Sequence, residues 1–181
     1  MSQVIENGWL STAQRVPSPN HNQRPQNEIS LLVIHNISLP PGAFGGPWVD
    51  ALFTNQLDPQ ADPSFADIAD LRVSSHLFIR RSGAIIQYVP FHLRAWHAGQ
   101  STFQTRHNCN DFAIGIELEG TDTSPYEDTQ YRILRHVTLT LMAKYPKITA
   151  ERITGHEQIA PGRKTDPGPA FDWDHYLSQL I

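Results

Sequence analysis

The sequence predicts one α/β domain, built on a central mixed β-sheet that is flanked by α-helices and connected by long irregular loops. Three observations lead to this fold class. Residues Ile29 to Ile34 form a short apolar run of the kind found in strands buried on both faces. Residues Phe112 to Leu118 alternate between apolar and small or polar side chains, as strands do. Farther on, Leu134, Val137 and Leu141 recur at helical spacing.

The length and the composition fit a single domain. The chain has 181 residues, of which 39% are hydrophobic and 18% are charged. Chains of about 100 to 200 residues commonly form one core. We expect residues 1–181 to form one domain, with residues 1–28 as an irregular N-terminal arm packed on it. Proline, asparagine and glutamine are frequent in that arm, as in irregular segments.

The first expected strand ends at His35, at the sheet edge where ligands bind in open α/β proteins. The segment Asn36 to Pro47 is rich in proline and glycine and is expected to be irregular. Short helices are expected over Trp48 to Leu57 and over Ser64 to Val73. The pair Asp62-Pro63 is a start signal for the second of them.

A hairpin and a longer helix should follow. Gly83 can supply the positive φ of a turn between strands at His76 to Arg80 and Ala84 to Val89. The pattern Ser124-Pro125-Tyr126-Glu127 predicts the start of a helix that ends near Tyr145-Pro146.

The C-terminal part should contain a short strand, a stiff loop and a last helix. Arg152 to Thr154 is the expected strand, and it presents His156. Three prolines between Thr154 and Pro169 fix φ and remove backbone donors, so the stretch from His156 to Asp166 should have a defined shape other than a regular helix. The last helix is expected over Asp172 to Leu180, capped by Asp172.

Composition also limits the partners. The formal net charge of −4 gives no general attraction to nucleic acid or to anionic membranes. Cys109 is the only cysteine, which excludes an internal disulfide and fits a reducing compartment. The first residues show no basic segment followed by an apolar core, so we expect no secretory signal. These features predict a cytoplasmic protein.

Three separated residues could form a metal site. His35, His156 and Asp166 match the two histidines and one carboxylate that some catalytic zinc sites use, with the fourth position left for water. Spacing alone is weak support, because a lone histidine after a strand more often makes a structural hydrogen bond. The HExxH pattern is excluded, since Ala160 stands where its second histidine should be.

Two further residues have open interpretations. Glu117 lies inside an apolar strand, where a carboxylate needs either an ion-pair partner or a catalytic role. Lys164, taken alone, is most simply a surface lysine.

Four segments in combination resemble the zinc-dependent N-acetylmuramoyl-L-alanine amidases. They are Leu31-Leu32-Val33-Ile34-His35-Asn36, Arg94-Ala95-Trp96-His97-Ala98-Gly99, Ile114-Gly115-Ile116-Glu117-Leu118-Glu119-Gly120, and Thr154-Gly155-His156 through Lys164-Thr165-Asp166-Pro167-Gly168-Pro169. The similarity covers nearly the whole chain in the same order. It implies one Zn²⁺ bound by His35, His156 and Asp166, with Glu117 as general base and Lys164 as the group that stabilises the developing oxyanion.

The resemblance also implies a reaction. It is hydrolysis of the amide between the lactyl group of (1,6-anhydro)-N-acetylmuramic acid and L-alanine in muropeptides, during cell-wall recycling. The residues expected to contact this substrate are Asn36, Arg72, Trp96, His97 and Arg106. For the arginines and the tryptophan, surface salt bridges and core packing are equally open. Asn108 stands where a basic residue is expected, a departure that bears on peptide recognition.

Two other functions remain as alternatives. A non-catalytic module that binds peptidoglycan fragments would have the same fold, and relatives of this kind have lost a metal ligand. The complete set of five residues argues against it here. A secreted lytic amidase predicts a signal sequence or wall-binding repeats, and neither is visible. The expected protein is a monomer whose partner is the anhydro-muropeptide, with no nucleic-acid or membrane partner.

Overall fold

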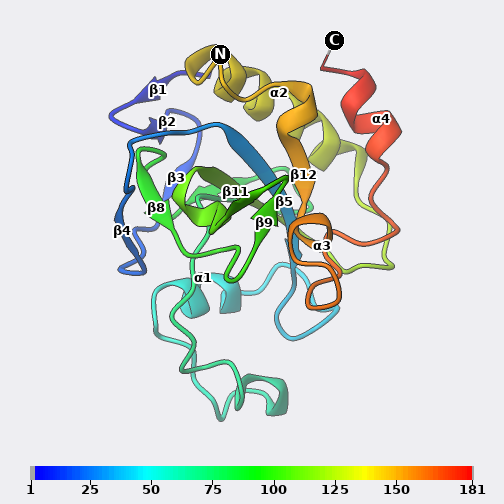
Figure 1. Cartoon of the computed structure of the whole chain (residues 1–181). Helices are drawn as coiled ribbons and strands as arrows, with labels where there is room; N and C mark the ends of the chain where they lie inside the picture. Colours follow the sequence, from blue (N-terminus) through cyan, green and yellow to red (C-terminus); the bar gives the residue numbers. More distant parts are fainter. Residues whose placement is uncertain (1–2, 181) are drawn as a thin grey trace.

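The computed structural model describes residues 3–180 and is built around a six-stranded mixed sheet in the order β12-β5-β11-β6-β7-β3 (Figure 1). These strands are β12 (Ile153–Gly155), β5 (Leu31–Ile37), β11 (Ala113–Glu119), β6 (Leu77–Ile79), β7 (Ile85–Gln87) and β3 (Gln14–Arg15). The first four strands of this order run parallel, and β7 runs antiparallel to β6. The expected α/β fold with a mixed sheet is therefore confirmed.

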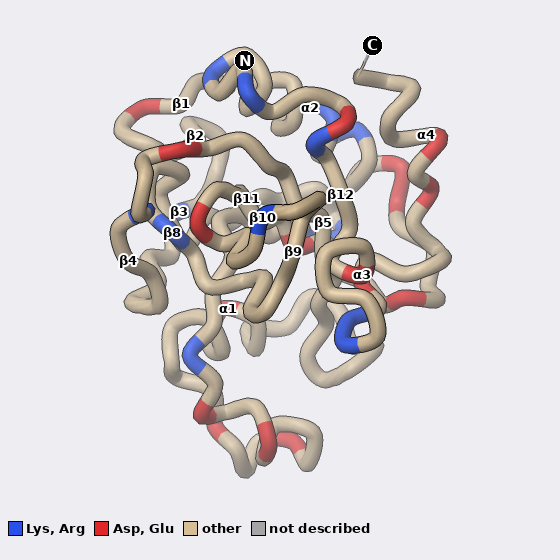
Figure 2. The backbone as a smooth tube through the Cα atoms, in the orientation of Figure 1, with Lys and Arg blue, Asp and Glu red and all other residues tan. Residues whose placement is uncertain are grey.

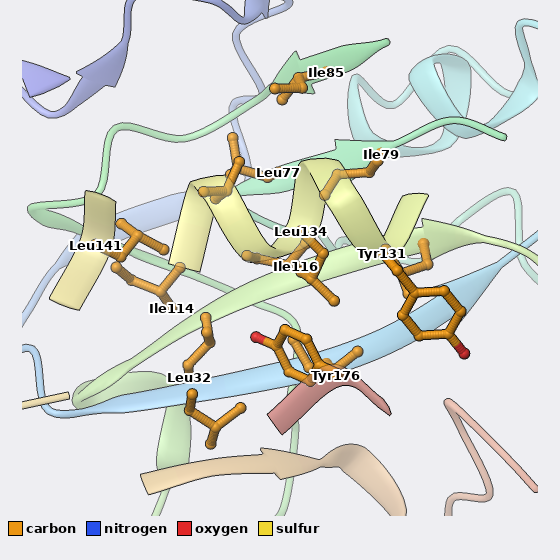
Figure 3. Packing of buried hydrophobic residues seen from close by; sticks show 14 of the residues in the cluster. Leu32, Leu77, Ile79, Ile85, Ile114, Ile116, Tyr131, Leu134, Leu141 and Tyr176 are labelled. Carbon is orange, nitrogen blue, oxygen red and sulfur yellow. The ribbon is translucent and has the colours of Figure 1, made fainter. Parts of the chain in front are cut away.

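The two faces of the sheet are covered by different elements. Helices α2 (Asp128–Lys144) and α4 (Trp173–Ser178) cover one face, where Leu134 and Tyr176 pack against side chains of β5, β11 and β6 (Figure 3). Helix α1 (Trp48–Phe53) packs on the other face, against Phe78 of β6. Because side chains alternate along a strand, each buried strand supplies both layers of the core.

Charge within the buried strands is confined to β11. In the five inner and buried strands β12, β5, β11, β6 and β7, Asp, Glu, Lys and Arg occur only as Glu117 and Glu119, and β3 at the sheet edge carries the exposed Arg15. Charged residues of both signs are dispersed over the rest of the backbone (Figure 2). Ile114, Ile116 and Leu118 belong to the core under α2. Glu117 therefore points to the opposite face of the sheet.

The expected hairpin is present as β6 and β7, with Gly83 at φ +85°. The arm expected to be irregular contains short strands. Of these, β3 adds to the main sheet and β4 pairs with β8, which ties the arm to the domain. The remaining short elements are β1 (Ile5–Glu6), β2 (Trp9–Leu10), β4 (His21–Gln23), β8 (Leu93–Ala95), β9 (Thr102–Phe103), β10 (Arg106–His107), α3 (His156–Ile159) and the 3₁₀ turns η1 (Pro63–Phe65), η2 (Cys109–Asp111) and η3 (Ala150–Arg152).

The expected helix from Ser64 to Val73 is wrong. Only η1 forms there, started as predicted by Asp62, whose side chain accepts a hydrogen bond from the backbone N–H of Ser64 at 2.9 Å. The apolar residues that follow pack individually against α1 and its neighbours instead of forming one helical face. A nucleated turn without a continuous apolar face does not extend.

Helix α1 ends at Phe53, before the expected Leu57, and α2 begins at Asp128, later than the pattern at Ser124 predicts. The Ser124 backbone N–H donates to Thr121 Oγ1 at 3.0 Å, which keeps this residue in a turn. The Glu127 backbone N–H instead donates to Gln130 Oε1 at 3.0 Å and begins the helix. The predicted end before Pro146 and the predicted cap of α4 by Asp172 are confirmed.

Within residues 3–180, no helix combines the length and the apolar character needed to cross a membrane.

The α2 layer gives a first prediction. Leu134 is completely buried under the sheet, so Leu134→Ala should lower the free energy of unfolding by about 2 to 5 kcal/mol, because it leaves a cavity. Arg132→Ala, at an exposed position of the same helix, is the control and should change it by less than about 0.5 kcal/mol. Urea unfolding measures both, and similar losses in the two variants would contradict this packing.

Candidate active site

Parallel pairing brings three residues to one edge of the sheet. His35 of β5 and Glu117 of β11 are directly paired in register. Gly155, the last residue of β12, pairs with Ile34, so that His156 follows immediately beside His35. The carboxyl ends of these strands meet at the lower edge of the sheet in Figure 1, next to α3.

The loop after β12 returns a carboxylate to the same point. Its first residues form α3, a single helical turn, and the Glu157 backbone N–H donates to the Asp166 carbonyl oxygen at 2.9 Å. The Pro167 carbonyl accepts hydrogen bonds from Asn36 Nδ2 at 3.0 Å and from the Tyr126 hydroxyl at 2.7 Å. These contacts fix the loop in a shape that turns Asp166 toward the two histidines.

His35, His156 and Asp166 form a compact group. His35 Nδ1 lies 3.0 Å from His156 Nδ1 and 3.0 Å from Asp166 Oδ2, and His156 Nδ1 lies 3.1 Å from Asp166 Oδ2. Both histidines are buried, and Asp166 is partly buried. Three atoms that can each offer a lone pair therefore converge within the space that a metal ion would bridge.

The protonation states favour a cation at this point. Burial lowers the pKa of His35 to about 4, against the opposing effect of Asp166, so that this imidazole is neutral at pH 7. Burial alone would raise the pKa of Asp166, but the two imidazoles at hydrogen-bond distance outweigh it and keep this pKa well below its usual range. A neutral imidazole and an ionised carboxylate are the forms that bind metals.

The two glutamates of β11 differ in the hydrogen bonds that their carboxylates accept. Glu119 Oε1 accepts from the Gly45 backbone N–H at 2.6 Å, and Glu119 Oε2 accepts from the Arg81 backbone N–H at 3.0 Å. Among the described residues, Glu117 Oε2 is buried without any hydrogen-bond partner. Burial, and then the charge of Asp166, raise the pKa of Glu117 well above its ordinary value. No ion pair with Glu117 is present among the described residues, which removes the structural explanation left open above.

A hollow of about 270 Å³ opens above this group. Glu117 and Lys164 line it together with the three candidate ligands, and Lys164 is exposed. Asn36, Trp96 and His97 line it as well. The structure thus brings together eight of the ten residues selected from the sequence.

Arg72 and Arg106 do not line this hollow. Arg72 is exposed beside its rim residues Leu71 and Val73. Arg106 Nη1 donates to Glu28 at 2.8 Å, and its guanidinium lies 3.9 Å from the centre of the Phe112 ring. Arg106 is therefore engaged elsewhere on the surface.

Sequence reasoning missed the apolar wall of the hollow, which consists of Ile37, Leu39, Leu52, Phe53, Ile68, Leu71 and Val73. The available signal was the group of apolar residues between Trp48 and Val73, whose spacing predicts helix packing instead. Leu71 is 45% exposed and lines the hollow, so its side chain does not serve the core alone.

The fold and this site define a peptidoglycan amidase. A family model described as N-acetylmuramoyl-L-alanine amidase matches residues 25–169, and the chain belongs to this family. The 1,6-anhydro-N-acetylmuramyl-L-alanine amidase AmpD of Enterobacter cloacae is 62% identical over 178 residues, which cover 98% of this chain and 95% of that relative. The resemblance inferred from the sequence is confirmed.

Solved structures agree with this assignment. A crystal structure of a selenomethionine AmpD derivative matches with a TM-score of 0.96 and 60% identity, over 98% of this chain and 99% of that chain. A complex of the N-acetylmuramyl-L-alanine amidase AmiD from E. coli with the substrate anhydro-N-acetylmuramic acid-L-Ala-D-gamma-Glu-L-Lys matches with a TM-score of 0.62 and 29% identity. It covers 99% of this chain and 66% of that chain.

The loop that carries Asp166 gives a second prediction. Gly168 and Gly162 both have positive φ, at +79° and +77°, but only at Gly168 would a Cβ collide, with the backbone of Asp122. Gly162→Ala should lower the free energy of unfolding by about 1 to 2 kcal/mol, the cost of a left-handed residue with a side chain. Gly168→Ala should lower it further, as measured by urea unfolding. Equal losses would mean that Gly168 is needed for its φ alone.

Proposed function

We propose that this enzyme uses one Zn²⁺, held by His35, His156 and Asp166, to hydrolyse the amide between the lactyl group of 1,6-anhydro-N-acetylmuramic acid and L-alanine in muropeptides. The observation that carries the proposal is the convergence of the three ligand atoms beside the unpartnered carboxyl of Glu117. The name of the E. cloacae relative supports the choice of bond and sugar. The substrate in the AmiD complex supports a peptide-bearing anhydro sugar as ligand.

The donor set fits zinc. Two imidazoles and one carboxylate are a ligand set of hydrolytic zinc sites, and they leave one side of the group open toward the hollow. When bound, zinc supplies Lewis acidity, which polarises an amide carbonyl and lowers the pKa of a water molecule to about 7. No serine or cysteine nucleophile is needed for this chemistry.

Glu117 and Lys164 have separate roles in the reaction, proton transfer and stabilisation of the developing negative charge. Glu117 accepts a proton from the attacking water as a general base and passes it to the leaving nitrogen of L-alanine as a general acid. Lys164 places its positive charge where the carbonyl oxygen becomes negative, an effect typically worth about 3 kcal/mol for a single donor. The products are the lactyl carboxylate and the free amine of the peptide.

We assign substrate contacts on the same basis. Trp96, His97 and Asn36 line the hollow, which supports contacts with the sugar or the first peptide residues. Arg72 stands beside the rim, where it can meet a peptide carboxylate. Arg106 is left out of these contacts, because it does not line the hollow and Glu28 already binds its guanidinium. The non-catalytic alternative has no observation in its favour.

The location and the assembly state are also proposed. A chain with a single buried cysteine needs no oxidising compartment, which supports action in the cytoplasm. We propose that the enzyme works as a monomer, since the groups that the proposed chemistry needs are complete within this chain. Fractionation of cells and light scattering of the purified protein test these two points.

Metal removal gives a third prediction. After chelation, the protein should no longer release the peptide from a defined anhydro-muropeptide, and added Zn²⁺ should restore the release, as followed by mass spectrometry of the products. Asp166→Ala should bind less zinc than the parent protein, because it removes one of three ligands. Undiminished cleavage after complete removal of metal would refute the zinc mechanism.

The pair of glutamates gives a fourth prediction. Glu117→Gln should keep zinc bound yet lower kcat by about 10² to 10⁴-fold, because the proton acceptor is lost. Glu119→Gln is the matched control in the same strand, and it should mainly lower stability, because it weakens the contacts to Gly45 and Arg81. Stopped assays of product formation measure kcat for both variants. Near-normal turnover of Glu117→Gln would reject Glu117 as the base.

The same variant has a pH signature in the metal-free protein. The folded-state pKa of Glu117 is raised above 4.5. The favourable contribution of Glu117 to the free energy of unfolding is therefore complete below about pH 4.5 and is lost as the pH rises through the raised pKa. Glu117→Gln should therefore gain stability relative to the parent as the pH rises. Urea unfolding at several pH values tests this sign.

A further inference from the structure

The two candidate ligand histidines both turn their second ring nitrogen toward one dipeptide. His35 Nε2 lies 2.9 Å from His97 Nδ1. His156 Nε2 lies 3.1 Å from the carbonyl oxygen of Ala98. Residues 97 and 98, which follow β8, thus contact both imidazoles on the side away from Asp166.

The chemistry of these contacts determines where each proton lies. A carbonyl oxygen can only accept, so His156 Nε2 must carry the hydrogen, and the Nδ1 of the neutral ring keeps its lone pair. His35 reaches the same state when its Nε2 donates to His97 Nδ1. Both Nδ1 atoms then present lone pairs beside Asp166 Oδ2, as a metal site requires.

We propose that His97 is a positioning residue, whose Nδ1 accepts the His35 Nε2 hydrogen and thereby holds His35 in the tautomer and orientation that bind the metal. This inference rests on the metal site proposed above. It assigns His97 a task different from contact with the substrate, although the same ring lines the hollow.

Asn110, Gly115 and His35 together fix the position of the His97 ring. Asn110 Oδ1 accepts from the backbone N–H of His97 at 3.1 Å and from that of Ala98 at 2.8 Å, and Asn110 is 5% exposed. A Cβ on Gly115 would lie 2.5 Å from His97 Cγ, so the absence of a side chain in β11 makes room for the ring. The rings of His97 and His35 meet edge to face, at 86° and 5.0 Å between centroids.

The second ring nitrogen of His97, Nε2, is consistent with this positioning role. Among the described residues, His97 Nε2 is buried and has no hydrogen-bond partner. A buried ring nitrogen without a hydrogen-bond partner lowers stability. If His97 served packing alone, an apolar side chain could fill the same space without that loss. Within residues 3–180, the one polar contact of the His97 side chain is the one to His35.

A matched pair of substitutions tests the proposal. Leucine and asparagine have nearly the same shape, but only asparagine offers an oxygen close to the position of His97 Nδ1. His97→Leu should weaken zinc binding by about 10- to 100-fold, the usual effect of losing such a partner, and His97→Asn should retain most of the parental affinity. Competition with a chromophoric chelator measures the affinity, and circular dichroism with urea unfolding reports whether each variant folds.

The outcomes separate this inference from the metal site itself. Equal losses in His97→Leu and His97→Asn would show that only the ring matters and would overturn the proposal, as would parental affinity in both. A parent protein without zinc affinity would instead refute the proposed metal site, and the role of His97 with it. Should His97→Leu fail to fold, ¹⁵N spectra of the zinc-loaded parent decide: His35 must carry its hydrogen on Nε2, and a metal-bound Nε2 would overturn the proposal.

Discussion

The site depends on the register of three parallel strands. Pairing of His35 with Glu117, and of Ile34 with Gly155, sets the positions of one candidate ligand, the candidate base and the residue before the second ligand. A slip of one residue in β11 would turn Glu117 into the core under α2, because side chains alternate along a strand. The alternating core residues on both sides of Glu117 therefore secure the register as well as the packing.

How much of this could be predicted from the sequence depends on the range of the contacts. The buried strands were predictable, because a local pattern of apolar residues specifies them. His35 lies near the carboxyl end of its strand as expected, although β5 continues two residues farther, to Ile37. The start of α2 was missed, because it depends on which oxygen satisfies the Ser124 N–H. Arg106 donates a hydrogen bond to Glu28, which is far from it in the chain, and no local sequence pattern shows this contact. The contrast that supports Glu117 as the proposed base is visible only in the structure: Glu119 is hydrogen-bonded, whereas Glu117 Oε2 has no partner among the described residues.

The stiff loop from His156 to Gly168 is held by residues outside it. Asn36 was selected as a substrate contact, yet its side chain donates both to Pro167 O and to Asp122 Oδ1 at 2.8 Å. Asp122 in turn packs against Gly168, where no side chain would fit. Prolines restrict the loop, but these contacts choose the shape that it takes. Asn36 thus contributes to the position of Asp166 whether or not it touches substrate.

The N-terminal arm contributes to the same site through a buried cation. Arg24, 4% exposed, donates to the carbonyl oxygens of Phe91, Asn110, Asp111 and Ala113, and burial lowers its pKa to about 10. Removing one partner of a buried charge is costly, so these carbonyls and Arg24 fix one another. The fixed segment includes Asn110, which holds His97 and Ala98. A chain of hydrogen bonds thus runs from the arm to both candidate ligand histidines, which gives the arm a part in the geometry of the site.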